Sequence, residues 1–239
     1  MTPRPDRPSP YHVAEMFGRI AERYDVMNSL MTGRLDQAWR VATVHALNPP
    51  IDGLALDVGT GTGRLASMLA DVMPGGRVVG LDLTLPMLRV GREWLREREE
   101  GQRIRLLAGD ALALPFRDGV FDCVTSAFTV RNLPDRLAGF REQVRVVKTG
   151  GSVACLELTW PRSLPVRALF PLYFDRLVPL VGRLISGDSG AYRYLPASVR
   201  AFPSPNQLGI IMRQAGLIDV RWRRLSFGAV ALHIGRKPG

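Results

Sequence analysis

The stretch "LDVGTGTGRL", residues 56–65, lies between a short apolar run and a new helical pattern. It places three glycines at alternate positions, Gly59, Gly61 and Gly63, shortly after Asp57. Small residues let the backbone approach a ligand closely, and the helix that follows presents unpaired N–H groups. This strand–loop–helix unit therefore predicts a site for a small ligand at the end of a strand.

The residues around the glycines exclude two common ligands of such loops. A P-loop needs Lys and Ser or Thr after its last glycine, whereas Arg64 and Leu65 follow Gly63 here. The dinucleotide fingerprint G-x-G-x-x-G needs a glycine at position 64 or 66, where the chain has arginine and alanine. Asp57 would also repel a pyrophosphate. We therefore expect a ligand that lacks phosphates and carries a positive group.

Strand and helix patterns alternate on both sides of this loop. Apolar runs predict strands at 53–58, 77–83, 103–110, 121–128 and 151–158, and helical spacing predicts helices at 62–72, 84–99 and 134–147. Such alternation predicts an α/β fold with a mostly parallel sheet that is covered on both faces. Two final strands, 217–225 and 228–236, are expected to form a closing hairpin.

The remaining segments predict helices outside the main alternation. We expect helices at 11–24, 35–47 and 204–215, and one or two amphipathic helices within 164–186. The Pro-rich residues 1–10 predict a flexible tail, and residues 11–239 a single domain. Within that domain we expect a cofactor-binding core at 50–160, cap helices within 11–47 and 164–200, and closing strands within 217–236.

Composition limits the classes of partner. The 239 residues are 46% hydrophobic and 23% charged, as in ordinary globular proteins, and the formal net charge is +10 with nearly all positive charge on arginine. The arginines are scattered and no RNA or DNA motif is present, so we expect no nucleic-acid partner. An anionic membrane surface and a negatively charged ligand remain open.

The cysteines and the apolar runs bear on compartment. Cys123 and Cys155 lie inside apolar runs, which indicates buried reduced thiols and neither a disulfide framework nor a metal site. The N-terminus has no apolar signal-like segment, and no apolar stretch is long enough to span a bilayer. We expect a cytoplasmic protein that associates peripherally with the inner face of the membrane.

Three carboxylates follow three consecutive strands. Asp57, Asp82 and Asp110 end the first, second and third predicted strands, so the parallel sheet brings them to one edge. A carboxylate at the end of the second strand can accept hydrogen bonds from ribose hydroxyls. Helix caps and turn formers are the alternative reading of these acids, and their order along three strands argues against it.

This pattern resembles the class I S-adenosylmethionine-dependent methyltransferases. The turn "VVKTGG" at 146–151 resembles that family's entry into its fifth strand. The resemblance implies a doubly wound, mostly parallel seven-stranded Rossmann-like sheet with a helical cap. It also implies S-adenosylmethionine as cofactor, with S-adenosylhomocysteine as product. By this resemblance the methionine part lies at Asp57, Gly59, Gly61, Thr62 and Gly63, the ribose at Asp82 and Leu83, and the adenine at Asp110 and Ala111.

Five further segments resemble the ubiquinone/menaquinone biosynthesis C-methyltransferases. They are "FGRIAERYDVMNSLMT" (17–32), "FTVRNLPD" (128–135), "LELTWP" (156–161), "YRYLPASVRAFPS" (192–204) and "GAVALHIG" (228–235). The resemblance implies methylation of a ring carbon of a lipid-soluble polyprenylated quinol, either demethylmenaquinol or a demethylated benzoquinol.

Some residues depart from that family. Asp36–Gln37 replaces a usual His–Arg pair, Ala127 a frequent serine, and Thr129 a frequent glycine. The particular quinone is therefore open, and another small aromatic or secondary metabolite is the alternative acceptor. A non-enzymatic binder of S-adenosylmethionine or of nucleic acid is a further alternative. Prenyl length, the general base and a homodimer also stay open.

The chemistry suggests catalytic candidates. A ring carbon of a hydroquinone becomes nucleophilic as the ring O–H is lost, and an arginine beside the oxygen stabilises the anion. Arg131, after the fourth strand, is assigned this role, and Asn132 is expected to bind the cofactor or orient Arg131. Tyr192 is expected to line the ring pocket or relay a proton, and His233 to act as a general base. Helix start, packing and structural roles are the respective alternatives.

Overall fold

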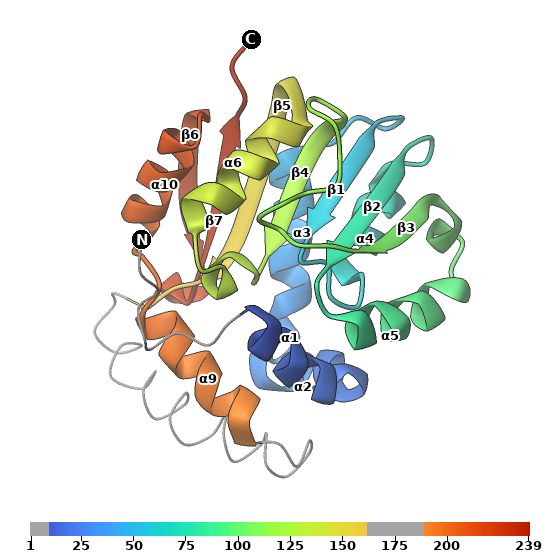
Figure 1. Ribbon diagram of the computed structural model, residues 1–239, viewed down its shortest axis with the longest axis vertical. Helices are drawn as coiled ribbons and strands as arrows, with labels where there is room; N and C mark the ends of the chain where they lie inside the picture. The colour runs from blue at the N-terminus through green and yellow to red at the C-terminus, as the bar shows by residue number, and fades with distance from the viewer. Residues whose placement is uncertain (1–9, 162–188) are drawn as a thin grey trace.

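The computed structural model describes residues 10–161 and 189–239. Its centre is a seven-stranded sheet with the order β3-β2-β1-β4-β5-β7-β6 (Figure 1). The neighbouring strands among β1–β5 are parallel to one another, whereas β7 runs antiparallel to both β5 and β6. The strands are β1 (Leu54–Val58), β2 (Arg77–Asp82), β3 (Ile104–Ala108), β4 (Phe121–Ala127), β5 (Val147–Leu158), β6 (Ile218–Leu225) and β7 (Val230–Arg236).

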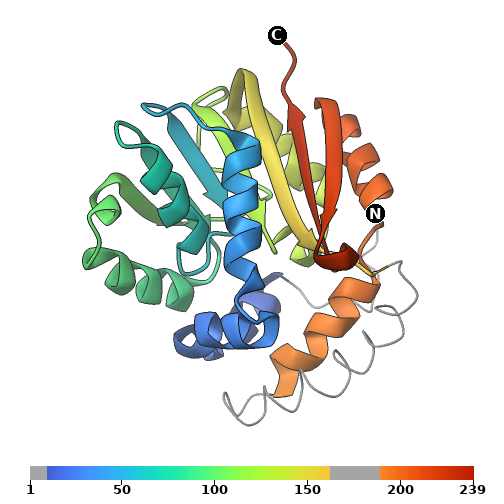
Figure 2. The ribbon, with the colours of Figure 1, turned by 180° about the vertical axis from the view of Figure 1, so that it is seen from behind.

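Helices cover both faces of this sheet. The helices α3 (Leu35–Leu47), α4 (Arg64–Val72) and α5 (Leu85–Arg96) lie on one face, and α6 (Arg136–Val146) and α10 (Pro205–Gln214) lie on the other (Figures 1 and 2). The central strand β1 is buried on both sides, since Ala55, Leu56, Asp57 and Val58 are all nearly inaccessible. The predicted doubly wound sheet, its mostly parallel strands and its closing hairpin are confirmed.

Three helices form a cap at the carboxyl ends of the parallel strands. They are α1 (Pro10–Arg19), α2 (Ala21–Thr32) and α9 (Ser189–Arg200), and they lie below the sheet in the view of Figure 1. Their shared contacts centre on a small apolar cluster whose buried members are Val13, Met16, Ile20 and Met27. The cap thus rests on a core of its own.

The cap differs from the sequence prediction in two respects. The helix at 35–47 was expected in the cap, but α3 lies on one face of the sheet (Figure 2). A single helix was expected at 11–24, but the chain forms two, with a break at Ile20, whose backbone has left the helical region. The second helix was missed because its apolar side chains do not share a face: Met27 is buried, whereas Val26 and Leu30 are 63% and 58% exposed. The helices expected within 164–186 lie outside the described residues.

Short helical turns complete the described chain. They are η1 (Glu100–Arg103), η2 (Val130–Asn132) and η4 (Ser226–Gly228). The turn η2 directly follows β4, and η4 connects β6 to β7, so both lie at the ends of strands. Across the described ranges, no helix has the length and apolar character that crossing a membrane requires.

Candidate active site

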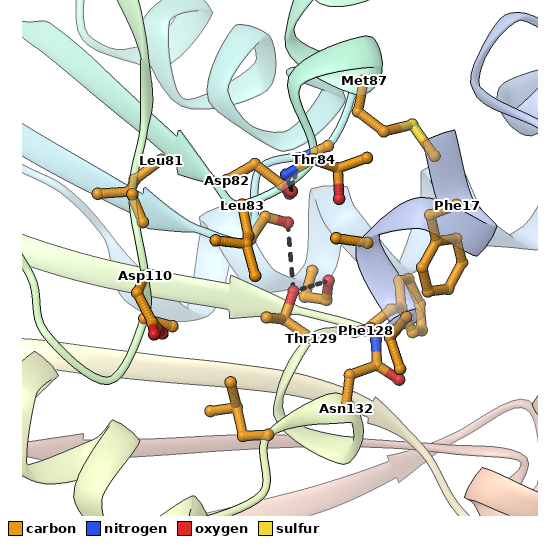
Figure 3. Close-up of a pocket in the computed structure, with 18 of the residues that line it drawn as sticks. Phe17, Leu81, Asp82, Leu83, Thr84, Met87, Asp110, Phe128, Thr129 and Asn132 are labelled. Atoms are coloured by element: carbon orange, nitrogen blue, oxygen red, sulfur yellow. Dashed lines mark hydrogen bonds between the residues drawn. The ribbon is translucent and has the colours of Figure 1, made fainter. Parts of the chain in front are cut away.

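The glycine loop between β1 and α4 is shaped by its backbone. Gly59 and Gly61 have φ values of +71° and +57°, in the left-handed region that favours glycine. A Cβ atom on Gly59 would lie 2.1 Å from Oγ1 of Thr129, whose hydroxyl donates to the Gly59 carbonyl oxygen at 3.2 Å (Figure 3). The loop therefore requires glycine at position 59 both for its backbone angles and for its close contact with Thr129.

Asp82 connects this loop to the end of β2. One carboxylate oxygen accepts the Gly61 N–H and the other accepts the Thr84 N–H, each at 2.8 Å. Burial raises the pKa of Asp82, and these N–H donors partly oppose the shift. A carboxylate oxygen can accept more than one hydrogen bond, so Asp82 retains acceptor capacity for hydroxyl groups.

One cavity lies beside this carboxylate at the carboxyl edge of the sheet (Figure 3). Asp110 also lines it, and its carboxylate accepts the Leu112 N–H at 2.8 Å. The predicted cofactor residues at this cavity are Gly59, Gly61, Asp82, Leu83, Asp110, Ala111 and Asn132. Apolar side chains of Phe17 from α1 and Met87 from α5 complete the walls (Figure 3). The cavity thus combines acceptors suited to a ribose with apolar surface suited to a flat base.

Asp57 lines a small polar cavity next to the first one, together with Thr62, Arg40 and Arg64. Its carboxylate accepts hydrogen bonds from Thr60 Oγ1 at 2.7 Å and Thr125 Oγ1 at 2.9 Å. Burial raises the pKa of Asp57 to about 6, although both hydroxyls and the charge of Arg40 act in the opposite direction. This carboxylate and the nearby guanidiniums can receive the ammonium and carboxylate groups of an amino acid.

Gly63 plays a different part from the other predicted loop residues. It has a φ of +78° and is the residue before the first turn of α4. A Cβ atom there would lie 3.2 Å from Leu95 of α5. Gly63 therefore serves the packing of α4 against α5, and it lines neither of the cavities described above.

A second, mostly apolar cavity adjoins the first on the cap side. Tyr24 of α2 and Phe128 line both cavities, so the two cavities meet at these residues. Phe128 has a φ of +59°, and the guanidiniums of Arg40 and Arg131 lie 5.6 and 5.8 Å from its ring centroid. The apolar part of the wall is Met31, Leu35, Trp39, Leu158, Leu195, Phe227 and Ala229.

Arg131 lies in the wall of the apolar cavity as an almost fully buried charge. Its Nη1 donates to Glu157 at 2.9 Å, and its backbone N–H donates to the other oxygen of the same carboxylate at 3.0 Å. Burial alone would lower the pKa of Arg131, but the charge and hydrogen bond of Glu157, together with Tyr24 and Tyr194, act in the opposite direction and the pKa is raised. Its Nε has no hydrogen-bond partner among the described residues. A charged donor is thus available in an apolar environment.

Asn132 and Tyr194 link the cap to this region. The Tyr194 hydroxyl donates to Asn132 Oδ1 at 3.2 Å, and the Asn132 side chain lines the first cavity. Asn132 does not cap the next helix, because Asp135 is the N-cap of α6 and accepts the Ala138 N–H. Tyr192 belongs to the same helix as Tyr194, α9, but its side chain lies outside the described residues.

His233 was expected to be a general base, and the structure argues against this. It lies in β7, fully buried, and lines none of the cavities described here. Its Nε2 contacts the Pro205 carbonyl oxygen at 2.9 Å, and its ring lies beside Trp222. Burial lowers the pKa of His233 to about 4, despite the opposing contact with Pro205. The ring therefore packs β7 against the α10 side of the sheet.

Four residues at the site had been given no role from the sequence. Tyr24 and Phe128 lie where the two cavities meet, while Asp36 and Arg40 form a buried ion pair in the wall of the second. A signal for this pair was present, because Asp36 and Arg40 are one helical turn apart in a segment that also carries apolar residues. Which way the Asp36–Arg40 pair faces relative to the sheet, however, depends on how the helix packs in the tertiary structure.

Comparison with known sequences places these features in a family. The model of the ubiE/COQ5 methyltransferase family matches residues 6–237. A demethylmenaquinone methyltransferase of Roseiflexus castenholzii is 50% identical over 99% of this chain and 98% of its own length. A protein of the same name from Thermus thermophilus is 44% identical over 93% of this chain and 100% of its own length.

Solved structures agree with the fold. An S-adenosylmethionine-dependent methyltransferase of Thermotoga maritima, described as a possible histamine N-methyltransferase, has a TM-score of 0.67 at 19% identity, covering 95% of this chain and 100% of that one. Phosphoethanolamine N-methyltransferase 2 of Haemonchus contortus, in complex with S-adenosyl-L-methionine, has a TM-score of 0.69 at 16% identity, covering 95% of this chain and 60% of that one. Membership of this methyltransferase family, rather than the likeness of fold, confirms the predicted enzyme class and S-adenosylmethionine as cofactor. The chain belongs to the ubiE/COQ5 methyltransferase family.

Proposed function

We propose that the protein transfers a methyl group from S-adenosylmethionine to a ring carbon of demethylmenaquinol. The observation that carries this proposal is the apolar cavity that meets the polar one at Tyr24 and Phe128. A lipid-soluble ring on the apolar side would face a methyl donor on the polar side. The relatives named demethylmenaquinone methyltransferase support a naphthoquinol as the acceptor.

The residues present fit the cofactor. Gly61 has open space where a Cβ atom would stand, and Asp82 carries acceptors at the cavity. Asp57 would hold the ammonium group of the methionine part, and Arg40 or Arg64 its carboxylate. When bound, S-adenosylmethionine supplies an electrophilic methyl group on a sulfonium, and it leaves as S-adenosylhomocysteine.

Arg131 would activate the acceptor. Loss of the ring O–H places negative charge on the quinol oxygen and on the neighbouring ring carbon, which then attacks the methyl group. A fixed guanidinium in an apolar cavity stabilises that charge far more than water does, because no solvent needs to reorganise. The pair with Glu157 holds the Arg131 side chain in place at the wall of the apolar cavity, where its guanidinium would donate to the ring oxygen.

Tyr24, Asn132 and Tyr194 would complete the wall on the methyl side. Tyr24 and Asn132 both line the first cavity, and Tyr194 orients Asn132 through its hydroxyl. They would keep the ring carbon in line with the methyl group at about 3–3.5 Å. Tyr192, on the helix that carries Tyr194, remains our proposed proton relay for the step in which the ring carbon loses its proton.

Substitution of Arg131 tests this role. We expect Arg131→Lys to lower kcat by about 100-fold, since removal of one charge-stabilising donor has effects of that order. The dissociation constant of S-adenosylmethionine should stay within about threefold of the wild-type value, because Arg131 does not line the cofactor cavity. Steady-state methyl transfer and calorimetric cofactor binding measure the two quantities. An unchanged kcat would remove Arg131 from the mechanism.

The ring class can be tested directly. Methyl transfer from labelled S-adenosylmethionine would be measured under reducing conditions with a short-chain demethylmenaquinol and, in parallel, with a demethylated benzoquinol. We expect product from the naphthoquinol and at least tenfold less from the benzoquinol. Product from neither, with cofactor binding intact, would contradict the proposed acceptor and direct the search to another aromatic metabolite.

We also propose that the cap, together with the neighbouring residues Leu35 of α3 and Phe227 of η4, contacts an anionic membrane from which the quinol enters. Leu35 and Phe227 line the apolar cavity and are 47% and 84% exposed. Val26 and Leu30 are also exposed, and they line a neighbouring groove that includes Arg34, Arg64 and Arg98. Exposed apolar side chains beside basic ones are typical of proteins that lie on anionic lipid surfaces.

Vesicle binding measures this contact. We expect Leu30→Glu/Phe227→Glu to reduce co-sedimentation with vesicles of phosphatidylglycerol and phosphatidylcholine several-fold, because two charges would enter the apolar contact. Ile210→Glu, on an exposed part of α10, is the matched control. Binding that the double variant leaves intact, or that the control reduces equally, would contradict a contact through this part of the cap.

A further inference from the structure

Asp36 is a carboxylate in the wall of the apolar cavity. Its side chain is only 8% exposed, and one oxygen pairs with Arg40 Nη1 at 2.5 Å. The other oxygen accepts from the Thr32 hydroxyl at 3.0 Å, a donor that it shares with the Asn28 carbonyl oxygen at 2.7 Å. Among the described residues that line this cavity, Asp36 is the one carboxylate, and Arg40 and Arg131 are the cations. Two contacts thus fix a negative charge at a cavity whose surface is mostly apolar.

The carboxylate retains capacity for a further donor. An ionised carboxylate offers about four acceptor positions, of which Thr32 and Arg40 use two. Removing a charged group from water is costly unless its hydrogen-bonding positions are filled. A bound molecule that is apolar yet carries a hydroxyl donor would fill one of the remaining acceptor positions. A molecule that offers only acceptor oxygens would be repelled by the carboxylate.

The two redox states of a quinone differ in this property. The reduced ring carries two hydroxyl groups, which can donate hydrogen bonds. The oxidised ring carries two carbonyl groups, which only accept them. Arg131 can donate to either state, because a guanidinium hydrogen-bonds to a hydroxyl oxygen as well as to a carbonyl. Of the three charged side chains that line the cavity, two from α3 and one from η2, Asp36 is therefore the one that can distinguish the two redox states.

We propose that Asp36, held by Arg40 and Thr32, accepts a hydrogen bond from a ring hydroxyl of the quinol and so discriminates against the oxidised quinone. This inference rests on the proposed function, and it makes Asp36 a specificity-determining residue. It has a functional reason, because only the reduced ring has a nucleophilic carbon. An oxidised ring of the same shape would otherwise occupy the apolar cavity and inhibit the enzyme.

Binding without turnover tests this directly. The full chain, saturated with S-adenosylhomocysteine, would be titrated anaerobically with a short-chain demethylmenaquinol and separately with the corresponding quinone. We expect the wild-type protein to bind the quinol at least tenfold more tightly, because a site built for a hydroxyl rejects an analogue that lacks it. Asp36→Asn should reduce this ratio to within about threefold, chiefly by tighter binding of the quinone. Asp118→Asn, which removes the same charge at an exposed ion pair with Arg145, should leave the ratio unchanged.

Equal binding of both redox states by the wild-type protein would overturn the inference, as would an unaltered ratio in Asp36→Asn. Should Asp36→Asn fail to fold, the two mono-O-methyl ethers of the quinol answer the same question on the unmodified protein. Weaker binding of at least one ether by tenfold supports the hydroxyl contact, and unchanged binding of both contradicts it. Methyl transfer to the quinol by the same preparation is measured alongside. Its absence would count against the proposed function, whereas transfer with equal binding of both redox states would count against Asp36 alone.

Discussion

Asp57 shows at the scale of one residue how burial changes the protonation of a carboxylate that we propose binds the cofactor's ammonium group. Its pKa is raised to about 6 because the carboxylate is buried beside the glycine loop. In the folded protein without ligand, the Asp57 carboxyl is therefore mostly protonated below about pH 6. In the unfolded chain it ionises from about pH 4, so the folded state loses stability relative to the unfolded state as the pH rises from about 4 to about 6. A cationic ligand group reverses this preference, since it favours the ionised carboxylate.

The affinity for S-adenosylmethionine should accordingly depend on pH. We expect it to be constant above pH 7 and to weaken by up to about tenfold per unit below the pKa of about 6. Isothermal titration between pH 5 and 8 measures this dependence. Asp57→Asn should bind more weakly at pH 7.5 and show no change over the same range. A variant that keeps the wild-type pH profile would mean that another group titrates.

The Arg131–Glu157 pair makes a prediction about stability. Both side chains are almost fully buried, so removing one charge leaves the other without compensation. We expect Glu157→Gln to lower the free energy of unfolding by about 3 kcal/mol, as measured by urea denaturation. Asp118→Asn breaks an exposed pair with Arg145 and should cost less than about 1 kcal/mol. Similar losses of unfolding free energy in the two variants would argue that the Glu157 carboxylate is exposed to solvent.

At the scale of elements, the glycine loop could be predicted from the sequence because its constraints are local. The strand, the alternate glycines and the start of α4 lie within residues 54–64. Asp57 and Asp82 lie at the carboxyl ends of β1 and β2, and Asp110 follows β3, so all three acids reach the expected edge of the sheet. The break between α1 and α2 could not be predicted, because the exposed side chains of α2 give no amphipathic pattern. Gly63 was assigned to the cofactor, although its contact is with Leu95 from a later helix.

The contact between Gly59 and Thr129 joins two such elements, and it can be tested by a rescue. Gly59→Ala should abolish cofactor binding, because its Cβ atom would overlap the Thr129 side chain. Gly59→Ala/Thr129→Gly removes that overlap and should restore part of the affinity. The residual loss should be about 1–2 kcal/mol, the cost of a left-handed backbone at a residue with a Cβ atom. Calorimetric titration with S-adenosylmethionine measures the affinity of both variants. An absence of rescue would indicate that the loss of binding in Gly59→Ala comes from the left-handed backbone at position 59 and not from the overlap with Thr129.

At the scale of the whole molecule, the apolar cavity is an assembly of distant segments. It takes side chains from α2, α3, η2, α9 and η4, and the Trp39 indole N–H donates to Ser226 Oγ at 2.8 Å across 187 positions of the sequence. No local pattern encodes such a contact, which is why Asp36 and Tyr24 received no role from the sequence. The carboxyl edge of the sheet, by contrast, follows from strand order, so several residues that line its cavity could be named in advance.

His233 shows the same limit of sequence reasoning, because here a catalytic role was predicted that the structure argues against. A histidine in the last strand suggested a base, but strand order places it between β5 and β6, where Trp222 and Pro205 enclose it. A histidine's chemistry depends on what surrounds it, and here the neighbours come from α10 and β6. Residue type alone therefore could not separate a catalytic group from a packing one.

The most direct test of the central claim is the fate of the methyl group itself. The protein would be incubated with S-adenosylmethionine carrying a ¹³C-labelled methyl group and a short-chain demethylmenaquinol under reducing conditions, and the product would be examined by NMR. The proposed transfer from the cofactor cavity to a quinol in the apolar cavity, which meet at Tyr24 and Phe128, predicts a methyl group bonded to a ring carbon. A methyl group on a ring oxygen, or no transfer by a protein that binds the cofactor, would contradict it.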